Sequence, residues 1–228
     1  MLDVAIRRLD GTTAVDLGTR AAPPLPVHPA LSSVLPNGLR RGSTVAVGGS
    51  ISLLLALLGA ASADGAWCAL VGFPRISAEA AAEYSIDLSR LAIVPAPTMQ
   101  TGQTMQTGQW ATAVGALLDA VDIVAARPPR LVPGDVRRLA ARARTREAVL
   151  MPYGDWPGAD VRVQASRGQW SGIGPGTGRL RARLVDVRVD GRGSAARPRQ
   201  ASLWLPAEGG GVTMAETIAP VVPVDLAG

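Results

Sequence analysis

The fold class is decided by one stretch, Thr44-Val45-Ala46-Val47-Gly48-Gly49-Ser50-Ile51-Ser52-Leu53-Leu54-Leu55-Ala56-Leu57-Leu58. Its first five residues are mostly apolar and β-branched, and they predict a short buried strand that Gly49 and Ser50 break. Residues 52–63 predict a helix with leucines 53, 54, 57 and 58 on one face. A buried strand, a tight glycine turn and a helix form the first unit of an α/β fold.

The same alternation continues along the chain. Further strands are predicted over residues 66–71, 91–94, 121–126 and 148–151, and further helices over residues 77–84, 111–118 and 134–147. Strands that alternate with helices in this way predict a mainly parallel sheet flanked by helices. From residue 160 onward the pattern changes, because residues 160–165, 179–190 and 200–205 alternate with turns alone. These segments predict antiparallel strands that extend the sheet.

Three regions follow from this pattern: an irregular N-terminal arm over residues 1–40, a core domain over 41–206 and a flexible tail over 207–228. The chain has 228 residues, 47% of them hydrophobic, which suits one globular domain with its own core. Its longest apolar run is shorter than the roughly 20 residues that a transmembrane helix needs, and its N-terminus has no signal-peptide pattern. A cytoplasmic protein without a membrane segment is therefore expected.

The composition excludes several kinds of chemistry. All 23 basic residues are arginine, so a Schiff base, a lysine base and a P-loop lysine are all impossible. His28 and Cys68 are single, which excludes a disulfide framework and a Cys/His zinc site within one chain. His28 lies in a proline-rich stretch and is interpreted as a linker residue.

The first strand–turn–helix unit occupies the position of a P-loop but lacks its chemistry. The turn holds Gly48, Gly49, Ser50 and Ser52, is too short for G-x-x-x-x-G-K-[ST], and runs directly into leucines. In the segment 121–127, Asp122 stands at the start of the strand, whereas a magnesium-binding carboxylate is needed at its end. We therefore expect a degenerate P-loop with no catalytic residue, cofactor or metal. A weak anion site at the helix N-terminus stays open as an alternative.

Three segments resemble the RecA core fold with its active site erased. Arg41-Gly42-Ser43-Thr44-Val45-Ala46-Val47-Gly48 is similar to the strand that leads into the RecA P-loop. Ser85-Ile86-Asp87-Leu88-Ser89-Arg90-Leu91 resembles the segment before the third core strand, and residues 184–205 resemble the last antiparallel strands. The resemblance covers about residues 30–206. The counterparts of the two DNA-binding loops are cut to residues 128–134 and 152–158, so we expect neither a RecA-type filament nor DNA binding through such loops.

A closer resemblance is to the actinobacterial ImuA-prime family. It is carried by residues 25–31, 35–43, 52–58, 155–160 and 178–183. The resemblance implies an accessory factor of damage-induced mutagenesis, which acts with ImuB, a Y-family polymerase homologue without catalysis, and with an error-prone C-family polymerase in translesion synthesis. It thus implies a non-enzymatic scaffold. The alternatives are a RecA-like protein that binds nucleotide, or one that binds DNA through an arginine-rich face.

Arginines and tryptophans supply the candidate contact residues. One group of arginines surrounds the apolar stripe of the helix at 134–147: Arg137, Arg138, Arg142, Arg144 and Arg146. A second group alternates with apolar residues on a predicted strand: Arg179, Arg181 and Arg183. These arginines fit a solvated surface, a nucleic-acid-facing patch or a surface for an acidic partner. Trp67 and Trp204 are expected in the core. Trp156 and Trp170, in short loops, are either partner anchors or plugs over the sheet.

Overall fold

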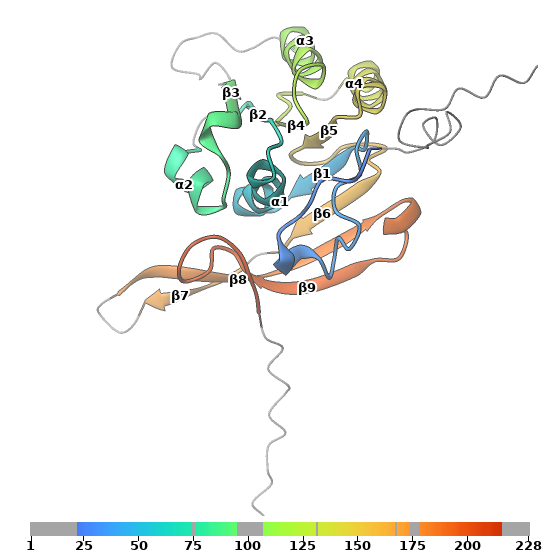
Figure 1. Ribbon diagram of the computed structural model, residues 1–228. Coiled ribbons are helices and arrows are strands. Elements are labelled where there is room, and N and C mark those ends of the chain that lie inside the picture. Colours follow the sequence, from blue (N-terminus) through green and yellow to red (C-terminus); the bar gives the residue numbers. More distant parts are fainter. Residues whose placement is uncertain are drawn as a thin grey trace, which may run out of the picture.

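A parallel sheet lies at the centre of the computed structural model (Figure 1), which describes residues 22–73, 76–94, 107–130, 132–166, 168–173 and 178–215. Four of its strands follow the order β3-β2-β4-β5, and all pair in parallel. Their bounds are Cys68–Val71 for β2, Leu91–Val94 for β3, Ile123–Ala126 for β4 and Val149–Pro152 for β5. The predicted strands of this half are thus confirmed, with shifts of one or two residues at their ends.

Strand β1, Val45–Gly48, joins this sheet to a second one. On one side, isolated parallel bridges connect Thr44 with Leu150 and Val47 with Tyr153. On the other side, β1 pairs in parallel with β6, Val161–Ala165. The order then continues β6-β8-β9-β10, so β1 is central although it comes first in the chain.

Alternate residues of the central strands face two separate cores. In β2 and β4, Leu70, Ile123 and Ala125 belong to the core that contains α1 (Ile51–Ala63) and α2 (Ala78–Glu83). Val71 and Val124 belong to the core under α3 (Thr107–Leu118) and α4 (Pro133–Arg146). The sheet is therefore buried on both faces, as Figure 1 shows, which explains the continuous apolar strands.

Helix α1 is buried more completely than an amphipathic helix. Ser50 caps its N-terminus by accepting a hydrogen bond from the backbone N–H of Leu53. The sequence predicts one leucine face, but Leu55 and Ala56 are buried as well, because the helix packs between the parallel sheet and the added strands. A helix that is apolar on all sides is typical of such a position.

The antiparallel half confirms two predicted strands and adds two that the sequence pattern missed. Strands β8 (Gly178–Gly191) and β9 (Arg199–Trp204) pair antiparallel, as expected. The missed strands are β7, Gln169–Ile173, and β10, Thr213–Met214. Strand β6 differs from the prediction because only its pairing with β8 is antiparallel, whereas its pairing with β1 is parallel.

Part of the predicted N-terminal arm is packed rather than loose. Leu25 and Leu39 exchange backbone hydrogen bonds of 2.9 Å, and a short 3-10 helix, Pro29–Leu31, lies between them. Leu31 and Val34 are buried in the core. His28 begins the short helix, where its Nδ1 accepts a hydrogen bond from the Ala30 N–H, consistent with a structural residue.

The predicted C-terminal tail likewise begins as ordered chain. Ala207 and Val212 are buried, and β10 pairs with β9, so the chain stays on the sheet through Ala215. The rest of the arm and of the tail, residues 1–21 and 216–228, lies outside the described residues. Within the described part of the chain, no helix has the length and apolar character needed to cross a membrane.

Candidate functional site

The turn between β1 and α1 is closely packed by the neighbouring strand. Gly49 has a φ of +80°, a backbone conformation that favours glycine. A Cβ atom on Gly49 would lie 1.9 Å from the carbonyl oxygen of Ala165 at the end of β6. A Cβ atom on Gly48 would lie 2.2 Å from Oε1 of Gln164. The glycines at the P-loop position thus allow β6 to lie against the turn.

An arginine from the antiparallel half reaches the amino end of α1. The Arg183 guanidinium donates a hydrogen bond of 2.8 Å to Oγ of Ser50, the residue that caps the helix. In a P-loop fold, backbone N–H groups at this helix end bind phosphate oxygens. Here the Arg183 guanidinium of β8 lies beside that helix end, so the side chain at this position is an arginine from a distant strand and not the P-loop lysine.

The surroundings of Arg183 hold it in place. Its guanidinium carbon lies 5.7 Å from the ring centroid of Trp170 on β7, within the range of a cation–π contact. The Ser52 hydroxyl, also at the P-loop position, is hydrogen bonded to Tyr84. Burial raises the pKa of Tyr84, so its phenol stays protonated at neutral pH. Ser50 and Ser52 therefore both interact with side chains from other parts of the chain.

Asp122 lies at the amino ends of the parallel strands, whereas the β1–α1 turn lies at their carboxyl ends, as the place of Asp122 at the start of the fourth strand predicts. Its carboxylate accepts hydrogen bonds from Arg41 at 2.8 Å and from the backbone N–H of Trp67 at 2.9 Å. The pairing of Asp122 with Arg41 was missed at the sequence level, because 81 positions separate the two residues. At the carboxyl end of β4 stands Arg127, whose guanidinium lies 5.7 Å from the Tyr153 ring centroid. Among the described residues, no three His, Cys, Asp or Glu side chains gather as a metal site.

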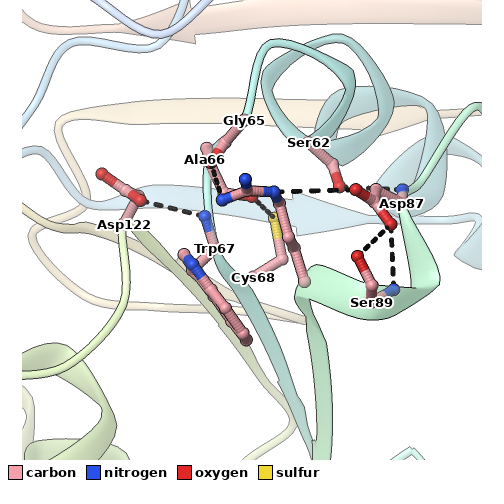
Figure 2. A network of polar contacts seen from close by, with 9 residues as sticks. Ser62, Gly65, Ala66, Trp67, Cys68, Asp87, Ser89 and Asp122 are labelled. Atoms are coloured by element: carbon pink, nitrogen blue, oxygen red, sulfur yellow. Dashed lines mark hydrogen bonds and ion pairs between the residues drawn. The ribbon is translucent and has the colours of Figure 1, made fainter.

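Figure 2 shows the polar network around Asp122 at the amino ends of β2 and β3. Ser62 accepts a hydrogen bond from the Asp87 N–H at 3.0 Å, and the Asp87 carboxylate in turn accepts from Ser89. Burial, reinforced by the Asp122 charge, raises the pKa of the Cys68 thiol to about 12. A thiol that stays protonated is a poor nucleophile, so this network reads as structural.

Trp67 lies in the same network but not in the core, where the sequence pattern placed it. Its side chain is 45% exposed, because the residue lies just before the amino end of β2, where it packs beneath the Arg90 guanidinium. Trp204 at the end of β9 is partly buried.

The arginines of α4 are largely engaged within the chain. Arg142 and Arg146 both bind the Asp119 carboxylate at the end of α3, and Arg138 pairs with Asp135 one turn away. The Arg142 hydrogen bond is the main reason that the pKa of Asp119 is lowered to about 2. Arg137 and Arg144 are exposed. This group joins α3 to α4 and offers less free positive charge than its sequence suggests.

The two loop tryptophans separate the two interpretations that the sequence left open. Trp156 is only 2% exposed and packs against Trp110, with ring centroids 6.5 Å apart, so it is a plug and no partner can reach it. Trp170 is 47% exposed and lies on β7 rather than in a loop.

The three arginines of β8 differ in environment. Arg183 turns toward α1, Arg181 pairs with Glu208 at 3.2 Å, and Arg179 is exposed. The arginine face of β8 is therefore not uniformly available to a partner, because Arg183 is bonded to the cap of α1. Sequence reasoning missed Gln164, which meets Gly48 through the parallel pairing of β6 with β1. It also missed Glu208, which lies 27 positions along the chain from its partner Arg181.

Comparison with known proteins agrees with this architecture. The chain is similar over 82% of its length to the crystal structure of the RadB recombinase, 97% of which is covered, with a TM-score of 0.59 and 13% sequence identity. At that identity the likeness shows the fold, which is a RecA-like α/β fold.

Sequence comparison gives a nearer relative. The chain is 31% identical over 171 residues to "Uncharacterized protein Rv3395c" of Mycobacterium tuberculosis, covering 69% of this chain and 77% of that protein. The family model described as the MT3502 N-terminal domain matches residues 33–158, which include β1, the β1–α1 turn and the parallel strands β2 to β5. This chain therefore belongs to the MT3502 N-terminal domain family.

Proposed function

We propose that this chain is a non-catalytic accessory protein that holds partner proteins together in damage-induced mutagenesis. The observation that carries the proposal is the contact of Arg183 with Ser50 at the amino end of α1. A nucleotide needs an open loop of N–H groups and a lysine at this position, and a RecA-like chain without them is suited to binding rather than hydrolysis.

The partners follow from the resemblance to the ImuA-prime family. We propose an ImuB-type Y-family polymerase homologue as the direct partner, and an error-prone C-family DNA polymerase reached through it. The exposed apolar side chains on β7 and β8 support a protein-binding role, because large apolar side chains on a surface often mark interfaces.

A second candidate function is binding of single-stranded DNA. It is favoured by Trp170, an exposed aromatic ring on the same hairpin as Arg179 and Arg181. Bases stack on such rings while arginines contact the phosphates. Binding of this kind weakens steeply as salt rises, because each neutralised phosphate releases counterions.

Co-expression with the cognate polymerase homologue tests the first function. The two chains are purified together and passed over a size-exclusion column at about 0.5 M salt, where the Debye length is only a few ångströms. We expect one co-eluting complex, since a packed apolar interface survives that salt. Separate elution of two folded chains would contradict the proposal. Binding to oligothymidylate that disappears at the same salt would favour the second function.

A further inference from the structure

The β7–β8 hairpin extends beyond the rest of the sheet (Figure 1). Among the described residues, β7 pairs with β8 alone, and all five of its residues are exposed. Three large apolar side chains lie on the hairpin: Trp170 at 47% exposure, Ile173 at 67% and Leu180 at 51%. An exposed apolar edge strand is a liability for a soluble protein unless something binds it.

At Trp170, the backbone N–H and carbonyl of β7 point toward the outer edge of the strand and can pair with an added strand. The Arg183 N–H donates to the Pro206 carbonyl at 3.0 Å, and the Arg183 carbonyl accepts from the Leu205 N–H at 2.7 Å. Both backbone groups of Arg183 therefore point away from β7. Trp170 lies directly opposite Arg183, so this is a non-hydrogen-bonded pair of the antiparallel ladder. The N–H and carbonyl of Trp170 consequently point to the open edge.

The base of the hairpin is fixed before any partner arrives. Arg183 bonds to Ser50 of the helix cap and lies over the Trp170 ring. A strand edge held in place by the fold loses little conformational freedom when a partner pairs with it.

The positive charge of Arg179 and Arg181 on the hairpin favours a partner segment with carboxylates. Arg179 forms no ion pair within the described residues, and Arg181 shares only an exposed pair with Glu208. Exposed pairs contribute little and exchange readily. A surface cavity of about 430 Å³ is lined by Arg179, Leu180 and Arg181 on one side and by Glu208 on the other. Since Arg183 is already engaged, Arg179 and Arg181 are the charges of the hairpin that carboxylates of a partner can meet.

We propose that the open edge of β7, with Ile173, Leu180 and Arg179 beside it, binds an extended segment of a partner protein as an added strand. The segment alternates apolar side chains, which cover Ile173 and Leu180, with carboxylates, which face Arg179 and Arg181. This assignment rests on the proposed scaffold function and gives that function a surface.

Titration of the full chain, labelled with ¹⁵N, tests the surface directly. The probe is a blocked octapeptide in which aspartate alternates with valine, and the readout is the shift of backbone amide signals. We expect saturable shifts concentrated at β7 and at the start of β8. N-methylation of alternate peptide nitrogens is expected to abolish them, because it removes strand pairing.

Two matched leucine variants make the test specific. L180S is expected to weaken peptide binding about tenfold, as loss of an interface hot spot does. L88S is the control, because Leu88 is exposed to a similar degree, at 45%, but lies before β3. Equal binding by both variants, shifts on another surface, or no response at millimolar peptide would overturn the proposal. The proposal would also be overturned if oligothymidylate bound more tightly and displaced the peptide. A dimer of this chain that L180S converts to monomers would overturn it as well.

The polymerase homologue then separates this inference from the proposed function. If wild type and the double variant I173S/L180S co-elute with it equally well, the scaffold function stands and the hairpin surface is refuted. If the peptide binds at β7 but wild type does not co-elute with the homologue, the surface stands and the proposed partner is refuted.

Discussion

The β1–α1 turn and the β7–β8 hairpin meet through one side chain, Arg183, yet they differ in every other respect. The turn is closed, since Gly49 lies against the Ala165 carbonyl and both serines have side-chain partners. The hairpin is open, with exposed apolar residues and an unpaired edge among the described residues. The position used for phosphate in P-loop folds is therefore packed against β6 here, while the exposed apolar side chains lie on the antiparallel addition.

The largest effect is expected from adding a methyl group to the turn. G49A places a Cβ atom against the Ala165 carbonyl and forces alanine to a φ of +80°. We expect a loss of about 3–5 kcal/mol in the free energy of unfolding, measured by urea denaturation, from backbone strain and overpacking together. The control is G134A in the first turn of α4, where nothing lies within 4 Å of the added atom. If both variants are equally stable, the turn is not closed as described.

Two leucines sharpen the contrast between a closed and an open region. L54A removes a fully buried side chain of α1 and is expected to cost about 2–5 kcal/mol of unfolding free energy. L180A removes a half-exposed side chain of the hairpin and is expected to change stability by less than about 0.5 kcal/mol. Thermal unfolding of both variants checks this, and a loss at Leu180 as large as that at Leu54 would show that the hairpin belongs to the core.

Arg183 is the point where the two regions can be separated. R183A loses the bond to Ser50 and the contact with Trp170, for an expected cost of about 1–2 kcal/mol. Amide hydrogen exchange in β7 is expected to accelerate, while exchange in β4 stays slow. R181A is the control, because the ion pair of Arg181 with Glu208 is exposed. Unchanged exchange in β7 after R183A would contradict the role of Arg183 as the link.

The smallest effect concerns acid stability and lies away from both regions. The Arg142 hydrogen bond lowers the pKa of Asp119 from its ordinary value of 3.8 to about 2. A lowered carboxyl pKa adds stability above the unfolded value, and this stability is lost as pH falls from about 4 to 2. D119N is therefore expected to show a smaller fall in melting temperature over that interval than wild type. An identical acid limb in both proteins would refute the contribution of this ion pair.

The sequence predicted the parallel half well because its signals are local. Ser50 before the leucine run fixes the start of α1, and the short apolar segments bounded by glycine or charge mark the strands. The antiparallel half was predicted less well, since the exposed residues of β7 carry no periodic apolar pattern.

In the candidate site, long-range pairing limited what the sequence could predict. The missing lysine was visible in the sequence, but the reach of Arg183 to Ser50 spans 133 positions and depends on the register of β8. For the same reason, the sequence left open whether Trp156 and Trp170 are buried plugs or exposed partner anchors. Only the three-dimensional packing places one beside Trp110 and the other on an open strand.

Thermal unfolding with and without magnesium and ATP shows whether the β1–α1 turn binds nucleotide, because any ligand that binds the folded state raises its stability. At a concentration 100 times its dissociation constant, a ligand adds about 2.7 kcal/mol. Because the turn is packed against β6, we expect no saturable rise in melting temperature at millimolar ATP. A saturable, magnesium-dependent rise that G49A abolishes would show that the β1–α1 turn still binds nucleotide, and would contradict a non-catalytic role for this position.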